Sequence, residues 1–149
     1  MSTLRRAIEI AEHAHRGQVR EGGAAFITHP EAVARSLADD GAGTRLLQVA
    51  WLHDVVEDTD WTLGALRRET FHEEVVAAVD ALTRRDGETY FDYLRRLARN
   101  PAARRVKQHD MRHNLSTLVD VPEGRRASQT KRYEKGLAFL ANVETAVAA

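Results

Sequence analysis

Residues 44–58 read TRLLQVAWLHDVVED. The run is apolar on nearly every side as far as Leu52, which is typical of a helix surrounded by other elements of the fold. It then ends in four ionisable side chains within six residues, from His53 to Asp58. We therefore expect a central buried helix whose polar end has a specific task.

Charged groups at a buried helix end need partners, because desolvating an unpaired carboxylate costs several kcal/mol. Helical spacing makes residue 53 a neighbour of 57, and residue 54 a neighbour of 57 and 58, about 5–6 Å apart at Cβ. One helix end could therefore hold both metal ligands and catalytic acids. The alternative remains that His-Asp is a common dipeptide and that Glu57 and Asp58 mark a solvated helix end.

The rest of the chain also shows helical periodicity, and no segment alternates apolar and polar residues with period two. Glycines, prolines and cap residues place the boundaries. Besides the central helix, we expect helices over 4–14, 30–39, 62–69, 73–82 and 90–97, one from Pro101 that includes Leu118, and a last one around Tyr133, Leu137 and Leu140 after a turn at 121–124. No repeat or linker divides the chain, which predicts an all-α fold with a single domain over residues 1–149.

The composition restricts the ligands and partners that we expect for this protein. The 22 basic residues balance 22 acidic ones, so no whole-molecule field favours nucleic acid or an anionic membrane. The absence of cysteine leaves His, Asp and Glu as metal ligands, a set that suits harder divalent ions. No run of 18 apolar residues and no leader-like start is present. We expect a soluble, cytoplasmic protein without membrane or nucleic-acid partners, as a monomer or a small homo-oligomer.

A second polar cluster follows Pro101, where Lys107, Asp110 and Asn114 share one helical face. An isolated face of this kind is more often a solvated stripe, and a lone histidine such as His29 is more often a cap than a ligand. Imidazole and carboxylate groups from separate helices are nevertheless what a His/Asp metal site requires. His29, His53, Asp54 and Asp110 together form a candidate set.

These residues fit a known pattern. His29, His53-Asp54 and Asp110 resemble the H…HD…D signature of the HD phosphohydrolase superfamily. The blocks AHRGQVREGGAAFITHP (14–30), WLHDVVEDT (51–59) and VKQHDMRHN (106–114) are similar to those of RelA/SpoT-type (p)ppGpp hydrolase domains and small alarmone hydrolases, including metazoan SpoT homologues. The resemblance extends from about Ala7 to Tyr133. It implies an all-helical bundle and a stand-alone hydrolase of the stringent-response alarmone.

The resemblance also implies roles for individual residues. His29, His53, Asp54 and Asp110 would bind one divalent metal, most often Mn²⁺. Glu57 and Asp58 would orient the attacking water while the metal polarises a phosphoryl oxygen. The nucleotide would be contacted by Arg20, Asn114 and Tyr133. The helical face after Pro101 adds Lys107, whose cation could offset phosphate charge.

Three departures concern the substrate. Glu21 stands where many alarmone hydrolases carry a basic residue, Gln129 where some carry an arginine, and His109-Asp110-Met111 replaces Ala-Asp-Arg or Ala-Asp-Leu. A negative charge near the nucleotide disfavours a highly phosphorylated ligand. The alternatives are therefore a nucleotide phosphatase that acts on a nucleoside monophosphate or the 2′-phosphate of NADPH, and a silent HD module that only binds a nucleotide.

Overall fold

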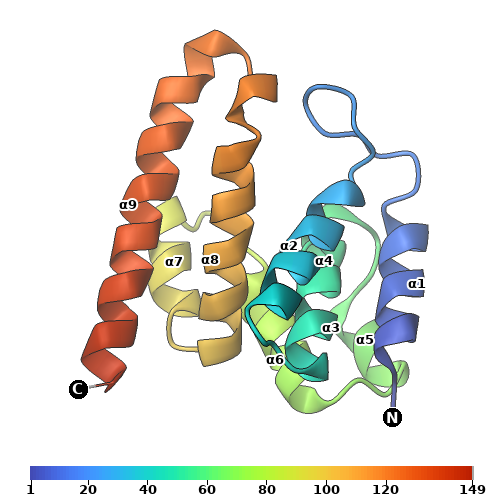
Figure 1. Ribbon diagram of the computed structural model, residues 1–149. Coiled ribbons are helices and arrows are strands. Elements are labelled where there is room, and N and C mark those ends of the chain that lie inside the picture. Colours follow the sequence, from blue (N-terminus) through green and yellow to red (C-terminus); the bar gives the residue numbers. More distant parts are fainter. Residues whose placement is uncertain (149) are drawn as a thin grey trace.

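The protein is seen in a computed structural model that describes residues 1–148, and these residues fold into helices joined by short connections (Figure 1). Within that range the only β-type pairing is an isolated bridge between Val19 and Ala25. The elements are α1 (Leu4–Ala14), α2 (Thr28–Asp39), α3 (Thr44–Leu52), α4 (Val55–Asp58), α5 (Leu63–Arg68), α6 (Glu73–Leu82), α7 (Tyr90–Leu97), α8 (Pro101–Ser116), a 3₁₀ turn (Leu118–Asp120) and α9 (Glu123–Ala148). The predicted all-α class is confirmed.

Helix α3 lies at the centre of the packing, in contact with α1, α2, α6 and α8. Its residues Val49, Ala50 and Leu52 are almost completely buried. The expectation of a central helix is thus confirmed for residues 44–52. Because four helices pack around α3, the C-terminal end of α3 is directed into the molecule.

The central run is not one continuous helix, however. Helix α3 ends at Leu52, His53 and Asp54 form a turn, and α4 restarts at Val55. A local hydrogen bond accounts for part of the break, because the His53 ring binds the backbone carbonyl of Ala50, 2.6 Å away. His53 and Asp54 therefore lie between α3 and α4, where their side chains converge with groups from other parts of the chain.

Further boundaries differ from expectation, and α2, for example, begins at Thr28 and not at Pro30. Helix α8 stops at Ser116, so Leu118 belongs to the 3₁₀ turn. The hydroxyls of Ser116 and Thr117 donate to the carbonyl of His113, at 2.7 and 3.3 Å, and so satisfy an acceptor that the helix end exposes. Helix α9 begins at Glu123, and Gly124 is consequently helical and not part of a turn.

Several helices begin at a threonine or asparagine cap. The side chains of Thr62, Thr89 and Asn100 each accept a hydrogen bond from a backbone N–H in the first turn that follows. At the end of α2, Gly41 adopts a φ of 80°, a left-handed conformation that costs glycine least. Within residues 1–148, no helix combines the length and apolarity needed to cross a membrane.

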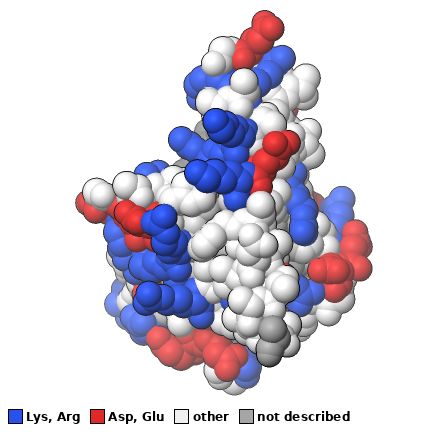
Figure 2. Space-filling view, turned by 90° about the vertical axis from the view of Figure 1, so that its left-hand side faces the viewer, with Lys and Arg blue, Asp and Glu red and all other residues white. Residues whose placement is uncertain are grey.

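Charge is distributed unevenly over the surface although the net charge is zero. Figure 2 shows the side of the molecule on which α9 lies, with blue Lys and Arg side chains gathered in its upper part and along one edge around an uncharged centre. Helix α9 contributes exposed cations, namely Arg125, Arg126, Lys131, Arg132 and Lys135. Any anionic ligand is therefore met by local groups.

Candidate metal centre

The break after α3 places His53 deep in the protein, where its ring is 2% exposed. Its Nδ1 lies 2.6 Å from the Ala50 carbonyl, which can only accept, so Nδ1 carries the proton. Its Nε2 then presents a lone pair toward Asp54 Oδ2 at 3.1 Å and Asp110 Oδ1 at 3.6 Å. Among the described residues this Nε2 has no hydrogen-bond partner.

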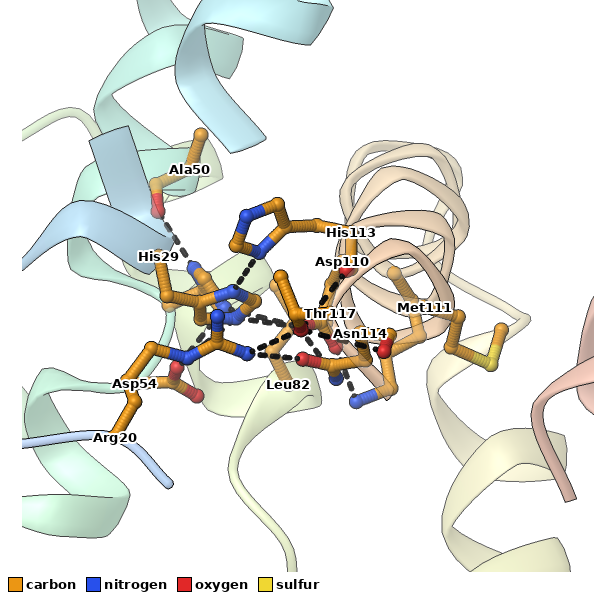
Figure 3. Close-up of polar contacts among 12 residues, drawn as sticks. Arg20, His29, Ala50, Asp54, Leu82, Asp110, Met111, His113, Asn114 and Thr117 are labelled. Atoms are coloured by element: carbon orange, nitrogen blue, oxygen red, sulfur yellow. Dashed lines mark hydrogen bonds and ion pairs between the residues drawn. The ribbon is translucent and has the colours of Figure 1, made fainter. Parts of the chain in front are cut away.

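Helix α2 contributes His29 from its first turn, where the following Pro30 is tolerated because N–H groups there need no partner within the helix. His29 Nε2 lies 2.7 Å from Asp110 Oδ1 and 3.7 Å from Asp54 Oδ2. The same two carboxylates thus face both imidazoles. Figure 3 shows His29, Asp54 and Asp110 converging on this point from three parts of the chain.

Helix α8 contributes Asp110, which is buried. Its Oδ2 accepts a hydrogen bond from Lys107 Nζ at 2.6 Å, and Asn114 Nδ2 lies 3.4 Å from its Oδ1. Burial alone would raise the pKa of the Asp110 carboxyl, but Lys107 and His29 hold it well below its usual value. Asp110 is therefore an anion at neutral pH.

The negative charges of Asp54 and Asp110 favour a cation between these groups. Burial would lower the pKa of the His53 imidazole, but Asp54 and Asp110 raise it well above its usual value. In other words, the site attracts positive charge, whether a proton or a metal ion. A lone pair facing two carboxylates is repulsive unless a cation lies between them.

The donor geometry fits a metal ion. The ligand atoms of His29, His53 and Asp54 all lie within 4.8 Å of one another, and Asp110 approaches both imidazoles. Two neutral imidazoles with two carboxylates suit a divalent first-row ion. The structure thus brings together all four residues expected to bind the metal, and their role as ligands stays a prediction.

Helix α4 places Glu57 and Asp58 next to this centre. Oxygens of Asp54, Glu57 and Asp58 lie within 4.8 Å of one another. Burial, the Asp54 charge and the Glu57 charge raise the pKa of Asp58 to about 7. Burial also raises the pKa of Glu57, whose Oε1 accepts a hydrogen bond from the backbone N–H of Arg84 at 2.9 Å. Asp58 can therefore exchange protons near neutral pH.

A cavity of about 250 Å³ opens beside Asn114. Arg20 Nη2 donates to Asn114 Oδ1 at 3.1 Å and to Thr117 Oγ1 at 3.2 Å, which fixes the guanidinium in the wall. The cavity is lined by Val19, Arg20, Glu21, Phe26, Asn114, Thr117, Asp120, Val121, Gln129 and Tyr133. Three of the four expected substrate contacts, Arg20, Asn114 and Tyr133, therefore share one cavity, whereas Lys107 is engaged with Asp110.

The structure also shows where the residues that depart from the alarmone-hydrolase pattern lie. Glu21 and Gln129 both line the cavity. Glu21 Oε1 accepts a hydrogen bond from Arg125 Nη2 at 2.8 Å, so its charge is partly offset by a cation of α9. His109 binds Ser36 Oγ at 2.7 Å, away from the four candidate ligands.

Some residues at or near the site were not predicted from the sequence. His113 Nδ1 lies 2.7 Å from His29 Nδ1, and the spacing of three from Asp110 was the available signal. His15 is buried beside Phe26, and Gln18 binds both the His15 ring and the carbonyl of Asp58. No sequence rule predicts the contacts of His113 with His29 and of Gln18 with Asp58, because these join distant segments of the chain.

A family model described as HD domain matches residues 7–122. A probable GTP pyrophosphokinase of Mycobacterium leprae (strain TN) is 37% identical over 151 residues, an alignment that covers 95% of this chain and 19% of that protein. The bifunctional (p)ppGpp synthase/hydrolase SpoT of Escherichia coli (strain K12) is 32% identical over 135 residues, covering 83% and 19%. The chain spans about a fifth of the length of these relatives.

A solved structure gives the same fold. It is described as a metazoan ortholog of SpoT that hydrolyzes ppGpp and plays a role in starvation responses. The TM-score is 0.78 with 24% sequence identity, covering 94% of this chain and 85% of that one. At this identity the likeness establishes the shared helical architecture.

Proposed function

This chain belongs to the HD-domain family, and from that premise we propose that it is a metal-dependent phosphohydrolase that removes the 3′-pyrophosphate of (p)ppGpp. The observation that carries the proposal is the position of Asn114, which contacts Asp110 of the metal centre and Arg20 of the cavity. A nucleotide in the cavity would therefore lie beside the metal. The resemblance to (p)ppGpp synthases and hydrolases selects the substrate.

The residues divide the chemistry between them. A divalent cation held by His29, His53, Asp54 and Asp110 would supply Lewis-acid polarisation of a phosphoryl oxygen. Phe26 and Tyr133 provide aromatic walls for the base, and Arg20 provides a cation for a phosphate.

Glu57 and Asp58 would hold the water and take its proton. The water oxygen bonds to phosphorus while the bond between phosphorus and the ribose 3′ oxygen breaks, and that oxygen receives a proton. Asp58, with a pKa near 7, is suited to pass protons in both directions. Pyrophosphate and GDP are the products from ppGpp.

The proposal also covers the metal ion, the ligand and the location in the cell. We take Mn²⁺ as the ion, a small nucleotide as the ligand and the cytoplasm as the location. The absence of cysteine and the balanced charge support these assignments. A homo-oligomer is compatible with them.

The test is a product analysis by anion-exchange chromatography after incubation with Mn²⁺ and ppGpp. We expect pyrophosphate and GDP, and a loss of roughly 100-fold or more in Asp54→Ala and Glu57→Ala. Glu74→Ala, an exposed acid on α6, is the matched control and should retain full activity. Release of orthophosphate from a nucleoside monophosphate or NADPH, with ppGpp untouched, would replace the alarmone as substrate. Binding of nucleotide without any turnover would identify a silent module.

A further inference from the structure

Two histidines face each other at the metal centre through like atoms. His29 Nδ1 and His113 Nδ1 lie 2.7 Å apart, a hydrogen-bond distance. Two lone pairs or two N–H groups cannot meet at that distance, so one nitrogen holds the only proton between them. The rings therefore have two arrangements, which differ in which histidine is the donor.

The two arrangements have opposite consequences for metal binding. If His113 donates, His29 must carry its proton on Nε2, where it can hydrogen-bond only to Asp110 Oδ1, 2.7 Å away. If His29 donates, its Nε2 presents a lone pair to the same space as Asp54 and Asp110. Only a lone pair can bind a metal ion.

The second metal-facing imidazole lacks this freedom. His53 uses Nδ1 to reach the carbonyl oxygen of Ala50, an atom that cannot donate. Its Nε2 lone pair is thus fixed by the backbone. Among the described residues, the partner of His29 Nδ1 is instead the His113 ring, a side chain that can either accept or donate.

We propose that His113 is a positioning residue that accepts the hydrogen bond from His29 Nδ1 and so holds His29 in the tautomer that binds metal. This rests on the proposed metal-dependent function and adds a residue to it. His113 and Asp110 lie one turn apart on α8, so a single helix supplies a metal ligand and the partner of another ligand. The hydroxyls of Ser116 and Thr117 bind the His113 carbonyl and hold that turn.

Two substitutions of equal length separate hydrogen bonding from packing. His113→Gln keeps an oxygen that can accept the His29 proton, whereas His113→Met has a similar length and no comparable acceptor. The readout is the Kd for Mn²⁺ from isothermal titration calorimetry, with folding checked by circular dichroism. We expect the Met variant to bind Mn²⁺ about 10- to 100-fold more weakly, and the Gln variant to stay close to the wild type.

The control is His72→Gln, which removes a histidine that caps α6 and should leave the Kd unchanged. Equal affinity in the Met variant and the wild type would overturn the role of His113, as would an equal loss in the Met and Gln variants. Failure of the wild type to bind Mn²⁺ is a different result, which would overturn the proposed metal function itself.

A measurement on the wild type covers the case in which a variant does not fold. Long-range ¹H–¹⁵N spectra of the Zn²⁺-loaded protein distinguish protonated from unprotonated ring nitrogens. We expect His29 Nδ1 to be protonated and His113 Nδ1 to be unprotonated. The reverse assignment would contradict the inference.

Discussion

The surroundings of Lys107 in the fold favour a role other than the one that the sequence suggested. Its ammonium group lies 2.6 Å from Asp110 Oδ2 and 5.2 Å from the centre of the Tyr93 ring. Burial would lower the pKa of Lys107, but Asp110 and Tyr93 raise it well above its usual value. The sequence suggested a phosphate contact, and the geometry favours a counter-ion that keeps Asp110 charged.

This position yields a stability prediction. Lys107→Met should lower the free energy of unfolding by about 3 kcal/mol, because removing one partner of a buried ion pair leaves the Asp110 charge uncompensated. Urea denaturation at pH 7 measures the loss. Lys131→Met, at an exposed position on α9, should cost roughly 0.5 kcal/mol or less. Similar losses in the two variants would show that Asp110 does not need Lys107.

Among the elements, the connection between α6 and α7 has a structural role next to Glu57 and Asp58. Arg96 of α7 donates from Nε and Nη2 to the Glu88 carboxylate, at 2.7 and 2.9 Å, and also to the carbonyl of Thr83. The same connection presents the Arg84 N–H that binds Glu57. A partly buried ion pair thus fixes the segment that supports Glu57.

The pKa of Glu88 gives this ion pair a pH dependence. Hydrogen bonds from Arg96 and from the Arg85 backbone lower the pKa of Glu88 from 4.5 to about 2. Because the folded-state pKa is depressed, the stabilisation is complete above about pH 4.5 and is lost as pH falls toward 2. Glu88→Gln should therefore be less stable than the wild type at pH 7, by roughly 1 kcal/mol or less, and the gap should close in acid.

Urea denaturation at pH 7, 5, 4 and 3 tests this window. Asp86→Asn, in the same connection but without a described ion pair, is the matched control and should show no such pH-dependent gap. A difference between Glu88→Gln and the wild type that is constant across these pH values would contradict the assignment.

On the scale of the whole molecule, the cavity beside Asn114 is closed by segments about a hundred residues apart. The loop after α1 meets the turn between α8 and α9 at the top of Figure 1. Glu21 pairs with Arg125 across this junction. A Cβ added to Gly22 would lie 2.8 Å from Asp120 Cγ and 2.9 Å from its Cβ, so the segments approach as closely as glycine permits.

Two adjacent glycines provide a matched test of this closure. Gly22 and Gly23 have φ values of 91° and 93°, so an alanine suffers the same backbone strain at either position. Only Gly22 faces Asp120, and nothing lies within 4 Å of a Cβ at Gly23. Gly22→Ala should therefore cost roughly 1–3 kcal/mol more than Gly23→Ala, because the loop and the turn must separate.

The displacement should also raise the KM for ppGpp in Gly22→Ala above that of Gly23→Ala, since Arg20 and Glu21 line the cavity beside it. Steady-state kinetics of the two variants measure this difference. Indistinguishable stability and KM would show that the cavity does not depend on the contact with Asp120.

The sequence alone determined what local spacing controls. Helical periodicity and caps gave the all-α class and the central helix over residues 44–52, because the 3.6-residue repeat depends only on neighbours in the chain. It also identified the donors His29, His53, Asp54 and Asp110 by residue type and motif. It missed the turn at His53, where no glycine or proline marks the break and the apolar pattern continues into Val55.

Only the tertiary structure decided which groups meet. His29 lies 81 residues from Asp110 and 84 from His113, and these contacts exist because α2 and α8 pack against α3. Packing likewise assigned Lys107 to Asp110 and left His53 Nε2 facing carboxylates. Burial determines such pairings, because a charged group that is removed from water pairs with the nearest suitable group in the fold. The distance between the two groups depends on the tertiary structure and cannot be read from the linear sequence.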